Sequence, residues 1–169
     1  MLPFPHTRFR MTLNKSSNLL IGEFSIEIEE HRRDVFPCSS GLRGHQTILN
    51  YWTRGKGPIP PSIAVAEDYR LNTSCYHSSK VGGLFFPISP DPIYPVGASP
   101  SVHGGTEGGS PMRCEIGLHL DTHGPGTSGC EGIQGKDNFQ CVCEILASCK
   151  LAGHLSLPHY IKYLTDAPC

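Results

Sequence analysis

Apolar and polar residues alternate over much of the chain, and this pattern predicts a mainly β fold. Phe24, Ile26 and Ile28 alternate with Ser25 and acidic residues, which is the period of a half-buried strand with a solvated acidic face. The same reasoning predicts further strands within residues 8–14, 18–29, 35–41, 63–69, 82–96 and 157–164. The run 87–95 carries four prolines, so we expect it at a sheet edge or outside the sheet.

One segment has the helical period instead. Its apolar side chains fall on one face of a helix predicted over 138–151: Phe139, Val142, Ile145, Leu146 and Cys149. Asp137 is expected to be the N-cap, with Gln140 completing a capping box, and Gly153 to end the helix. We therefore expect a mainly β domain, a sandwich or half-open barrel, with one C-terminal helix packed on the sheet.

Length and composition fit this picture. A chain of 169 residues is one domain by length and buries about two thirds of its unfolded surface. The 19 glycines and 15 prolines suit a loop-rich β domain. Residues 1–17 are either an N-terminal extension or the first strand, and 18–169 form the single domain.

Charge and hydropathy argue against several partners. The net charge of −1 gives no electrostatic reason to expect nucleic acid or an anionic membrane. No apolar run approaches the ~20 residues that span a bilayer. The N-terminus lacks the basic and apolar regions of a signal peptide, so either such a signal has been removed or the protein reaches its target by another route.

The eight cysteines are numerous for a chain of this size: Cys38, Cys75, Cys114, Cys130, Cys141, Cys143, Cys149 and Cys169. They show no paired zinc-knuckle spacing, because Cys141 and Cys143 are too close and have no second pair. One or two disulfides, or reduced thiols that fill core space, both agree with the sequence.

The stretch 113–130 carries the candidate chemistry. Cys114, Ile116, Leu118 and Leu120 fall on one face of a predicted strand, and Arg113, Glu115, His119 and Asp121 on the other, which puts His119 on the accessible side. Gly124, Pro125 and Gly126 exclude a helix in the loop that follows. Cys130 comes directly after Gly129, so two successive backbone N–H groups are available to form an oxyanion hole. His119 and Cys130 are therefore a candidate base and thiol nucleophile.

Other interpretations of these residues stay open. A buried cysteine is often a small apolar residue, and a strand histidine is often a surface residue. His119 and His123, with Asp121 or Cys130, also offer zinc ligands, and His103 with His119 and His123 would suit a zinc amidase. The loop argues against zinc, since a His-x-x-x-His pair converges best on a helix.

The motif resembles a known signature. His119 followed by Thr127-Ser128-Gly129-Cys130 is similar to the catalytic domain of the L,D-transpeptidase (YkuD-like) family, whose pattern is His, a spacer, then Ser/Thr-x-Gly-Cys. The likeness is best to the short-spacer members in phage and bacterial cell-wall proteins, and it covers 113–132. Where that family often has an aliphatic residue and then Arg or Asn, this chain has Glu131 and Gly132.

The resemblance implies an L,D-transpeptidase-like β-sandwich or half-barrel and specific roles. Cys130 would attack the stem peptide of peptidoglycan at the L-centre of its diamino acid, releasing D-Ala, with His119 as base and no cofactor or metal. The carbonyl of Leu120 would orient the imidazole, with the Asp121 side chain as the alternative. Thr127 and Ser128 would shape the turn before Cys130, and Arg113 is a further expected substrate contact. Apart from the resemblance, Trp52 stands beside Arg54 and Lys56 on a rigid Gly/Pro loop and either lines a substrate groove or caps the core. His103, in the Gly/Ser loop that leads to the His119 strand, is either a second site histidine or a loop residue.

Two functional questions follow from Glu131. A carboxylate beside the nucleophile would disfavour substrate carboxylates and raise the thiol pKa, and this favours hydrolysis of the acyl-enzyme over transpeptidation. It also favours a competing class, a non-catalytic structural or wall-binding virion protein that keeps the fold and binds other virion proteins. Either class predicts a location in the cell wall or a phage particle.

Overall fold

The computed structural model describes residues 4–98, 112–122 and 126–165. It is mainly β, with one helix packed against a large sheet, as the pattern predicts. The strands are β1 (His6–Leu13), β2 (Gly22–Glu29), β3 (Arg32–Leu42), β4 (Arg70–Asn72), β5 (Tyr76–Ser78), β6 (Gly83–Ser89), β7 (Gly117–Leu120), β8 (Gly126–Ile133) and β9 (Ser156–Thr165). The helix α1 spans Lys136–Leu151, and short 3-10 turns cover Ile48–Asn50 and Ser62–Ala64.

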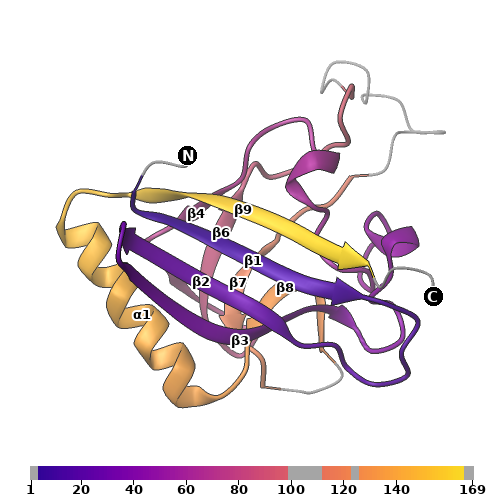
Figure 1. The fold of residues 1–169 in the computed structure, drawn as a ribbon, viewed down its shortest axis with the longest axis horizontal. Coiled ribbons are helices and arrows are strands. Elements are labelled where there is room, and N and C mark those ends of the chain that lie inside the picture. The colour runs from indigo at the N-terminus through magenta and orange to yellow at the C-terminus, as the bar shows by residue number, and fades with distance from the viewer. Residues whose placement is uncertain (1–3, 99–111, 123–125, 166–169) are drawn as a thin grey trace.

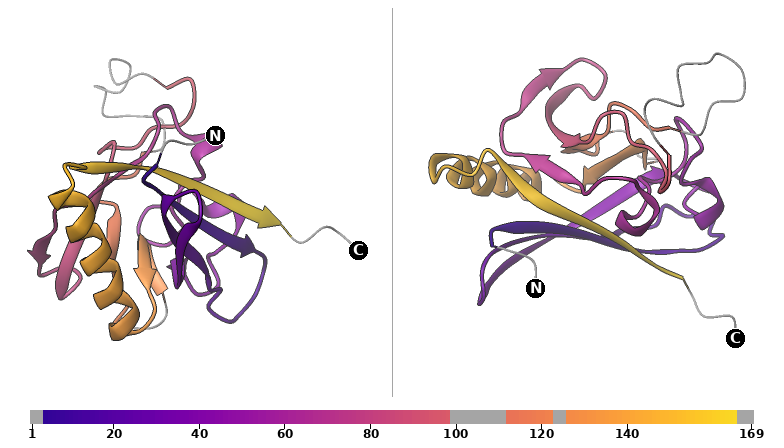
Figure 2. Two further views of the ribbon diagram at one scale, coloured as in Figure 1. Left: turned by 60° about the vertical axis from the view of Figure 1, so that its left-hand side comes forward. Right: turned by 90° about the horizontal axis from the view of Figure 1, so that it is seen from above.

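The strands pair in the order β4-β9-β1-β2-β3-β8-β7-β6-β5. Because β4 also pairs with β6, all strands except β5 form a closed ring. In the right-hand view of Figure 2, β1, β2 and β3 lie on one side and the strands from β4 to β7 on the other. β1 pairs with β9 in parallel, and β7 pairs with β8 in parallel. The second of these parallel pairs positions the candidate site.

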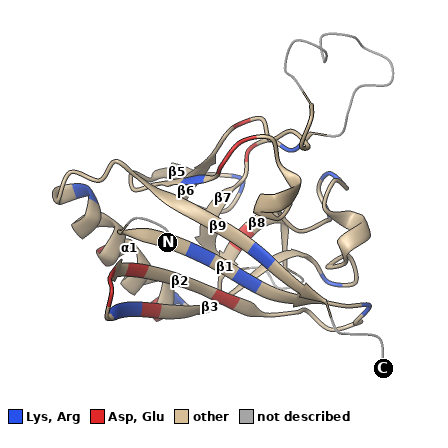
Figure 3. Cartoon of the chain, turned by 45° about the horizontal axis from the view of Figure 1, so that its top comes forward, with Lys and Arg blue, Asp and Glu red and all other residues tan. Residues whose placement is uncertain are grey.

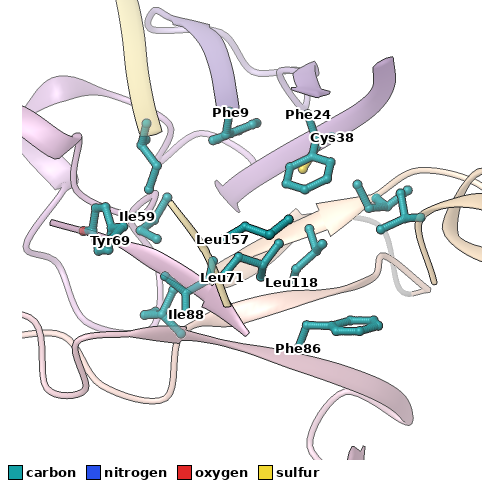
Figure 4. Close-up of a cluster of buried hydrophobic side chains, with 14 of the residues drawn as sticks. Phe9, Phe24, Cys38, Ile59, Tyr69, Leu71, Phe86, Ile88, Leu118 and Leu157 are labelled. Atoms are coloured by element: carbon teal, nitrogen blue, oxygen red, sulfur yellow. The ribbon is translucent and has the colours of Figure 1, made fainter. Parts of the chain in front are cut away.

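The interior of this ring is a single apolar cluster (Figure 4). Phe9, Phe24, Leu118 and Leu157 are fully buried in it, each from a different strand. Since Phe9 lies on β1, between β9 and β2, the segment His6–Leu13 is an integral strand and not an extension.

α1 lies along one side of the sheet (Figure 1) and contributes the stripe that the sequence predicts. Phe139, Val142, Leu146 and Cys149 are buried in the core cluster, and Ile145 packs at its edge. The Phe139 ring meets Phe86 of β6 edge-on, with centroids 6.3 Å apart. The predicted helix is therefore confirmed, together with its buried face.

The predicted end of the helix is confirmed, but its predicted start is wrong. Gly153 has a φ of +94° and its N–H bonds to the Lys150 carbonyl, while the next N–H bonds to Cys149, which is a Schellman motif. At the other end the cap is Gly135, with a φ of +88° and no side-chain hydrogen bond. Asp137 thus lies inside the first turn, where its charge favours the helix dipole but caps nothing, so there is no capping box with Gln140.

Three expectations about strands need correction. Residues 63–69 are not a strand: Val65 makes a single bridge with Pro95, and the strand forms at Arg70–Asn72 instead. Pro95 adds no donor to this bridge, because proline has no N–H. The proline-containing run was expected at a sheet edge or outside the sheet, yet its first residue, Pro87, lies in the inner strand β6. Pro87 pairs with Gly117 of β7 on one side. On the other side it falls between the residues that pair with β5 and those that pair with β4. The residues from Gly126 onward, expected to belong to the loop before Cys130, form strand β8.

Charged side chains of opposite sign occur on neighbouring strands (Figure 3). Glu27 of β2 is 3.1 Å from the Arg8 guanidinium of β1 and 3.9 Å from that of Arg33 on β3. Within the described part of the chain, no helix has the length and apolar character needed to cross a membrane.

Candidate functional site

The parallel pairing of β7 and β8 brings the two candidate residues together. Leu118 is paired with Glu131 and His119 with Gly132, so Cys130 lies one step before the ladder, level with Gly117. Because Glu131 pairs with Leu118 and not with Leu120, the chain has returned toward the start of β7 by the time the parallel ladder begins. Through this topology a histidine on one strand and a cysteine eleven residues later come to line the same cleft.

His119 and Cys130 line one cleft with a volume of about 450 Å³. Asp121, Thr127 and Ser128 also line it. Tyr76, Lys80 and Arg54 complete it from distant parts of the chain, and sequence analysis did not single them out as site residues. Four predicted site residues are thus gathered around Cys130.

His119 is held as a neutral imidazole. Its Nδ1 is 2.8 Å from the carbonyl oxygen of Leu120, and its ring stacks on Phe85 with centroids 6.4 Å apart. A carbonyl only accepts, so Nδ1 carries the proton and Nε2 is a proton acceptor. Burial lowers the pKa of His119, and the Leu120 carbonyl and the Asp121 charge oppose this only in part. The predicted orienting role of the Leu120 carbonyl agrees with this geometry.

Asp121 is engaged elsewhere. Its Oδ2 accepts hydrogen bonds from Gln134 Nε2 at 2.8 Å and from Ser39 Oγ at 3.3 Å. Its contribution to His119 is therefore electrostatic, and the backbone carbonyl is the group that orients the ring.

Cys130 is a protonated thiol at neutral pH. Burial raises its pKa to about 11, while the Gly117 N–H and the Arg113 charge act in the opposite direction. Its Sγ is 3.6 Å from the Glu115 carbonyl, which accepts the thiol hydrogen bond. Such a thiol needs a base at the moment of attack, and His119 is a neutral base in the same cleft.

Glu131 does not reach the cleft, and the interpretation that placed its carboxylate beside the substrate is wrong. Successive strand residues point to opposite faces, so Glu131 enters the interior and is fully buried. Its Oε1 is 2.8 Å from His159 Nε2, and His159 Nδ1 is 2.9 Å from Thr7 Oγ1. From there its charge still raises the pKa of Cys130, as expected, although by less than burial does.

The buried Glu131–His159 pair gives a stability prediction. Glu131→Ala removes the carboxylate that His159 Nε2 contacts inside the core, so we expect the free energy of unfolding to fall by about 3–5 kcal/mol. Urea denaturation measures this, with the exposed Glu23→Ala on β2 as the matched control. Equal, small losses in both variants would contradict the buried network.

Arg113 and Trp52 do not line the cleft. The Arg113 side chain is 1% exposed and its guanidinium donates to the carbonyls of Tyr51, Gly57, Pro58 and Ser128. Trp52 is half-buried and packs against the core. Neither location suits the substrate contact that the sequence suggested, and His103 lies outside the described residues.

Metal binding and disulfide bonds are the other roles that the sequence allows for these histidines and cysteines. Among the described residues, no three His, Cys, Asp or Glu side chains gather to hold a metal ion; His123, like His103, is outside that range. The cysteines that the structure describes are free thiols: Cys38, Cys75, Cys114, Cys130, Cys141, Cys143 and Cys149. Cys114 lines the cleft with Cys130, although its alternation predicted the apolar face.

What this arrangement can do follows from the chemistry of its groups. A buried thiol, an imidazole with a fixed tautomer and a glycine directly before the cysteine are the parts needed for acyl transfer through a thioester. Searches with models of protein families, among curated proteins and among solved structures returned no match to this chain.

Proposed function

We propose that the protein is a cysteine acyltransferase or peptidase of the L,D-transpeptidase type that acts on the stem peptide of peptidoglycan. The observation that carries the proposal is the pairing of Cys130 with His119 in one cleft, with the imidazole fixed by the Leu120 carbonyl. The resemblance of 113–132 to the family signature supports the choice of substrate and of fold. Under this proposal the enzyme works at the cell wall or in a phage particle.

The reaction begins from a neutral pair. As Sγ of Cys130 attacks the carbonyl carbon, the thiol proton moves to Nε2 of His119. The carbonyl oxygen becomes an oxyanion that the N–H groups of Gly129 and Cys130 stabilise. The C–N bond then breaks, His119 gives its proton to the leaving D-Ala amine, and an acyl thioester remains on Cys130. Water, or the amine of a second stem, takes the acyl group.

Hydrolysis of the acyl-enzyme is the outcome we propose, although the position of Glu131 does not support it. Glu131 is buried, so its carboxylate does not repel an incoming stem peptide. Arg54 and Lys80 line the cleft instead, and Lys80 is paired with Glu115 at 2.5 Å. In transpeptidation the acceptor amine must outcompete water at ~55 M. That requires a second groove that positions the amine, and such positioning supplies about 7–11 kcal/mol of the barrier, whereas hydrolysis needs only access for water.

Incubation with a donor tetrapeptide and an excess of acceptor stem tests the function. Tripeptide and free alanine as the main products would support hydrolysis of the acyl-enzyme. Cross-linked dimer as the main product would show that the enzyme is a transpeptidase instead. If neither forms while the folded protein still binds peptidoglycan, the structural virion role is correct and the enzyme proposal fails.

The pH dependence of acylation is a second test of the pair. The rate should fall as pH drops through the pKa of His119, which burial lowers from its usual value, because the base becomes protonated. Above that pH the rate should be level. In His119→Asn the level region should vanish, and the rate should rise about tenfold per pH unit toward the thiol pKa of about 11. A level rate near neutral pH in His119→Asn would contradict the role of His119.

A further inference from the structure

We propose that Arg113 and Ser40 are positioning residues that turn the two backbone N–H groups at Gly129 and Cys130 toward the cleft. The inference rests on the proposed function and deepens it, because it assigns the residues that build the oxyanion site. Neither residue lines the cleft, so both act through the backbone of the segment that carries the nucleophile.

Arg113 is the first of the two anchors. It is one of the largest fully buried side chains, and the acceptors it has among the described residues are backbone carbonyls. Nη2 is 3.2 Å from the carbonyl oxygen of Gly57 and 3.2 Å from that of Ser128. The guanidinium therefore ties the residue two before the nucleophile to the 51–58 loop.

The direction of the Ser128 carbonyl sets the direction of the next N–H. In a planar trans peptide the C=O and N–H bonds point to opposite sides. Since the Ser128 carbonyl points inward to Arg113, the N–H of Gly129 points the other way, to the side on which Ser128 is exposed and lines the cleft.

Ser40 is the second anchor and fixes the following peptide. Its Oγ donates to the Gly129 carbonyl at 3.2 Å and accepts from the Ile59 N–H at 2.9 Å. The Gly129 carbonyl, like that of Ser128, is thus bonded to a side chain that does not line the cleft, so the Cys130 N–H is directed outward as the Gly129 N–H is. Successive carbonyls on one side are not regular strand geometry, and the Gly129 φ of +116° makes this possible.

Arginine is required here for its shape as well as its charge. A guanidinium offers several N–H donors in a fixed plane, whereas an ammonium is a point donor on a flexible stem. Burial lowers the pKa of Arg113, and a thiolate at Cys130 would raise it, so the two groups are close enough to interact.

Two reactions of Cys130 separate positioning from reactivity. Acylation by p-nitrophenyl acetate forms an oxyanion, whereas alkylation by iodoacetamide does not. In Arg113→Lys and in Ser40→Ala we expect acylation to slow by about 10²-fold relative to alkylation. Arg10→Lys, an exposed arginine of β1, is the matched control and should leave both rates unchanged.

Equal falls in the acylation and alkylation rates, or no fall in either rate, would overturn the inference. Thermal unfolding identifies a variant that fails to fold, and the remaining variant of the two then decides. If the wild-type protein is acylated by p-nitrophenyl acetate but not by the tetrapeptide, the proposed substrate fails and the role of Arg113 and Ser40 is still decided by the rate ratio. If neither reagent acylates Cys130 in the wild-type protein, both proposals fail.

Discussion

Cys130→Ala is expected to abolish acyl-enzyme formation, with a loss of turnover of about 10⁴-fold or more. The reason is that, in the proposed mechanism, the Cys130 sulfur itself forms the bond to the acyl group. The measurement is release of D-Ala from the tetrapeptide, followed with the intact mass of the protein.

Two other cysteines make this experiment specific. Cys75→Ala removes an exposed thiol and should leave turnover unchanged. Cys114→Ala removes the other thiol that lines the cleft and tests whether that sulfur is the nucleophile instead. Loss of turnover in Cys114→Ala together with full turnover in Cys130→Ala would reverse the assignment.

Gly129→Ala is expected to slow acylation by about 10³-fold, although it adds a single methyl group next to the nucleophile. A Cβ at this position would lie 1.7 Å from Nη2 of Arg113 and 3.1 Å from the Gly57 carbonyl oxygen. The buried guanidinium must then move away from the Ser128 carbonyl, or the peptide must turn, and either change disturbs the N–H groups of the oxyanion site.

The matched control for Gly129→Ala is Gly44→Ala. Gly44 has a φ of +77° and open space where a Cβ would go, so this variant carries the backbone strain of about 1–3 kcal/mol without the clash. Unfolding in urea and acylation kinetics of both variants separate the two effects. Acylation that is intact in Gly129→Ala would contradict the close approach of Arg113 to the nucleophile segment.

The sequence predicted those parts of the fold that depend on local period. Strands near residues 24, 85 and 160 and the helix follow from alternation or the 3.6-residue repeat, because each buries one face in the common core. The three-residue strands β4 and β5 were not predicted, since they exist only through pairing with β6 and β9. The alternation of apolar and polar residues does not predict β8, because glycines at 126, 129 and 132 carry no apolar signal.

The site was predicted in part for the same reason. His119 and Cys130 are recognisable from their spacing, but the location of Arg113 is not. Counting alternate residues put Arg113 on the face of His119, yet Glu115 has a φ of +55° and breaks the extended chain between them. The phase of the alternation changes there, which buries Arg113 and leaves Cys114 at the cleft.

Glu131 shows how neighbours in sequence can be separated in space. Adjacency to Cys130 suggested a carboxylate in the substrate site, whereas the strand turns it to the opposite face. Its partner there, His159, lies on β9, which is two strands beyond β2 in the sheet order. Only the three-dimensional pairing reveals that this acid contacts His159 in the interior and does not line the cleft.

The most direct measurement for the whole account is rapid acid quenching of the protein with excess tetrapeptide, followed by peptide mapping. The account predicts a mass increase equal to the tetrapeptide minus alanine, on the peptide that contains Cys130, and none in Cys130→Ala. An unmodified Cys130 under conditions where the protein is folded, or an adduct confined to Cys114, would contradict it.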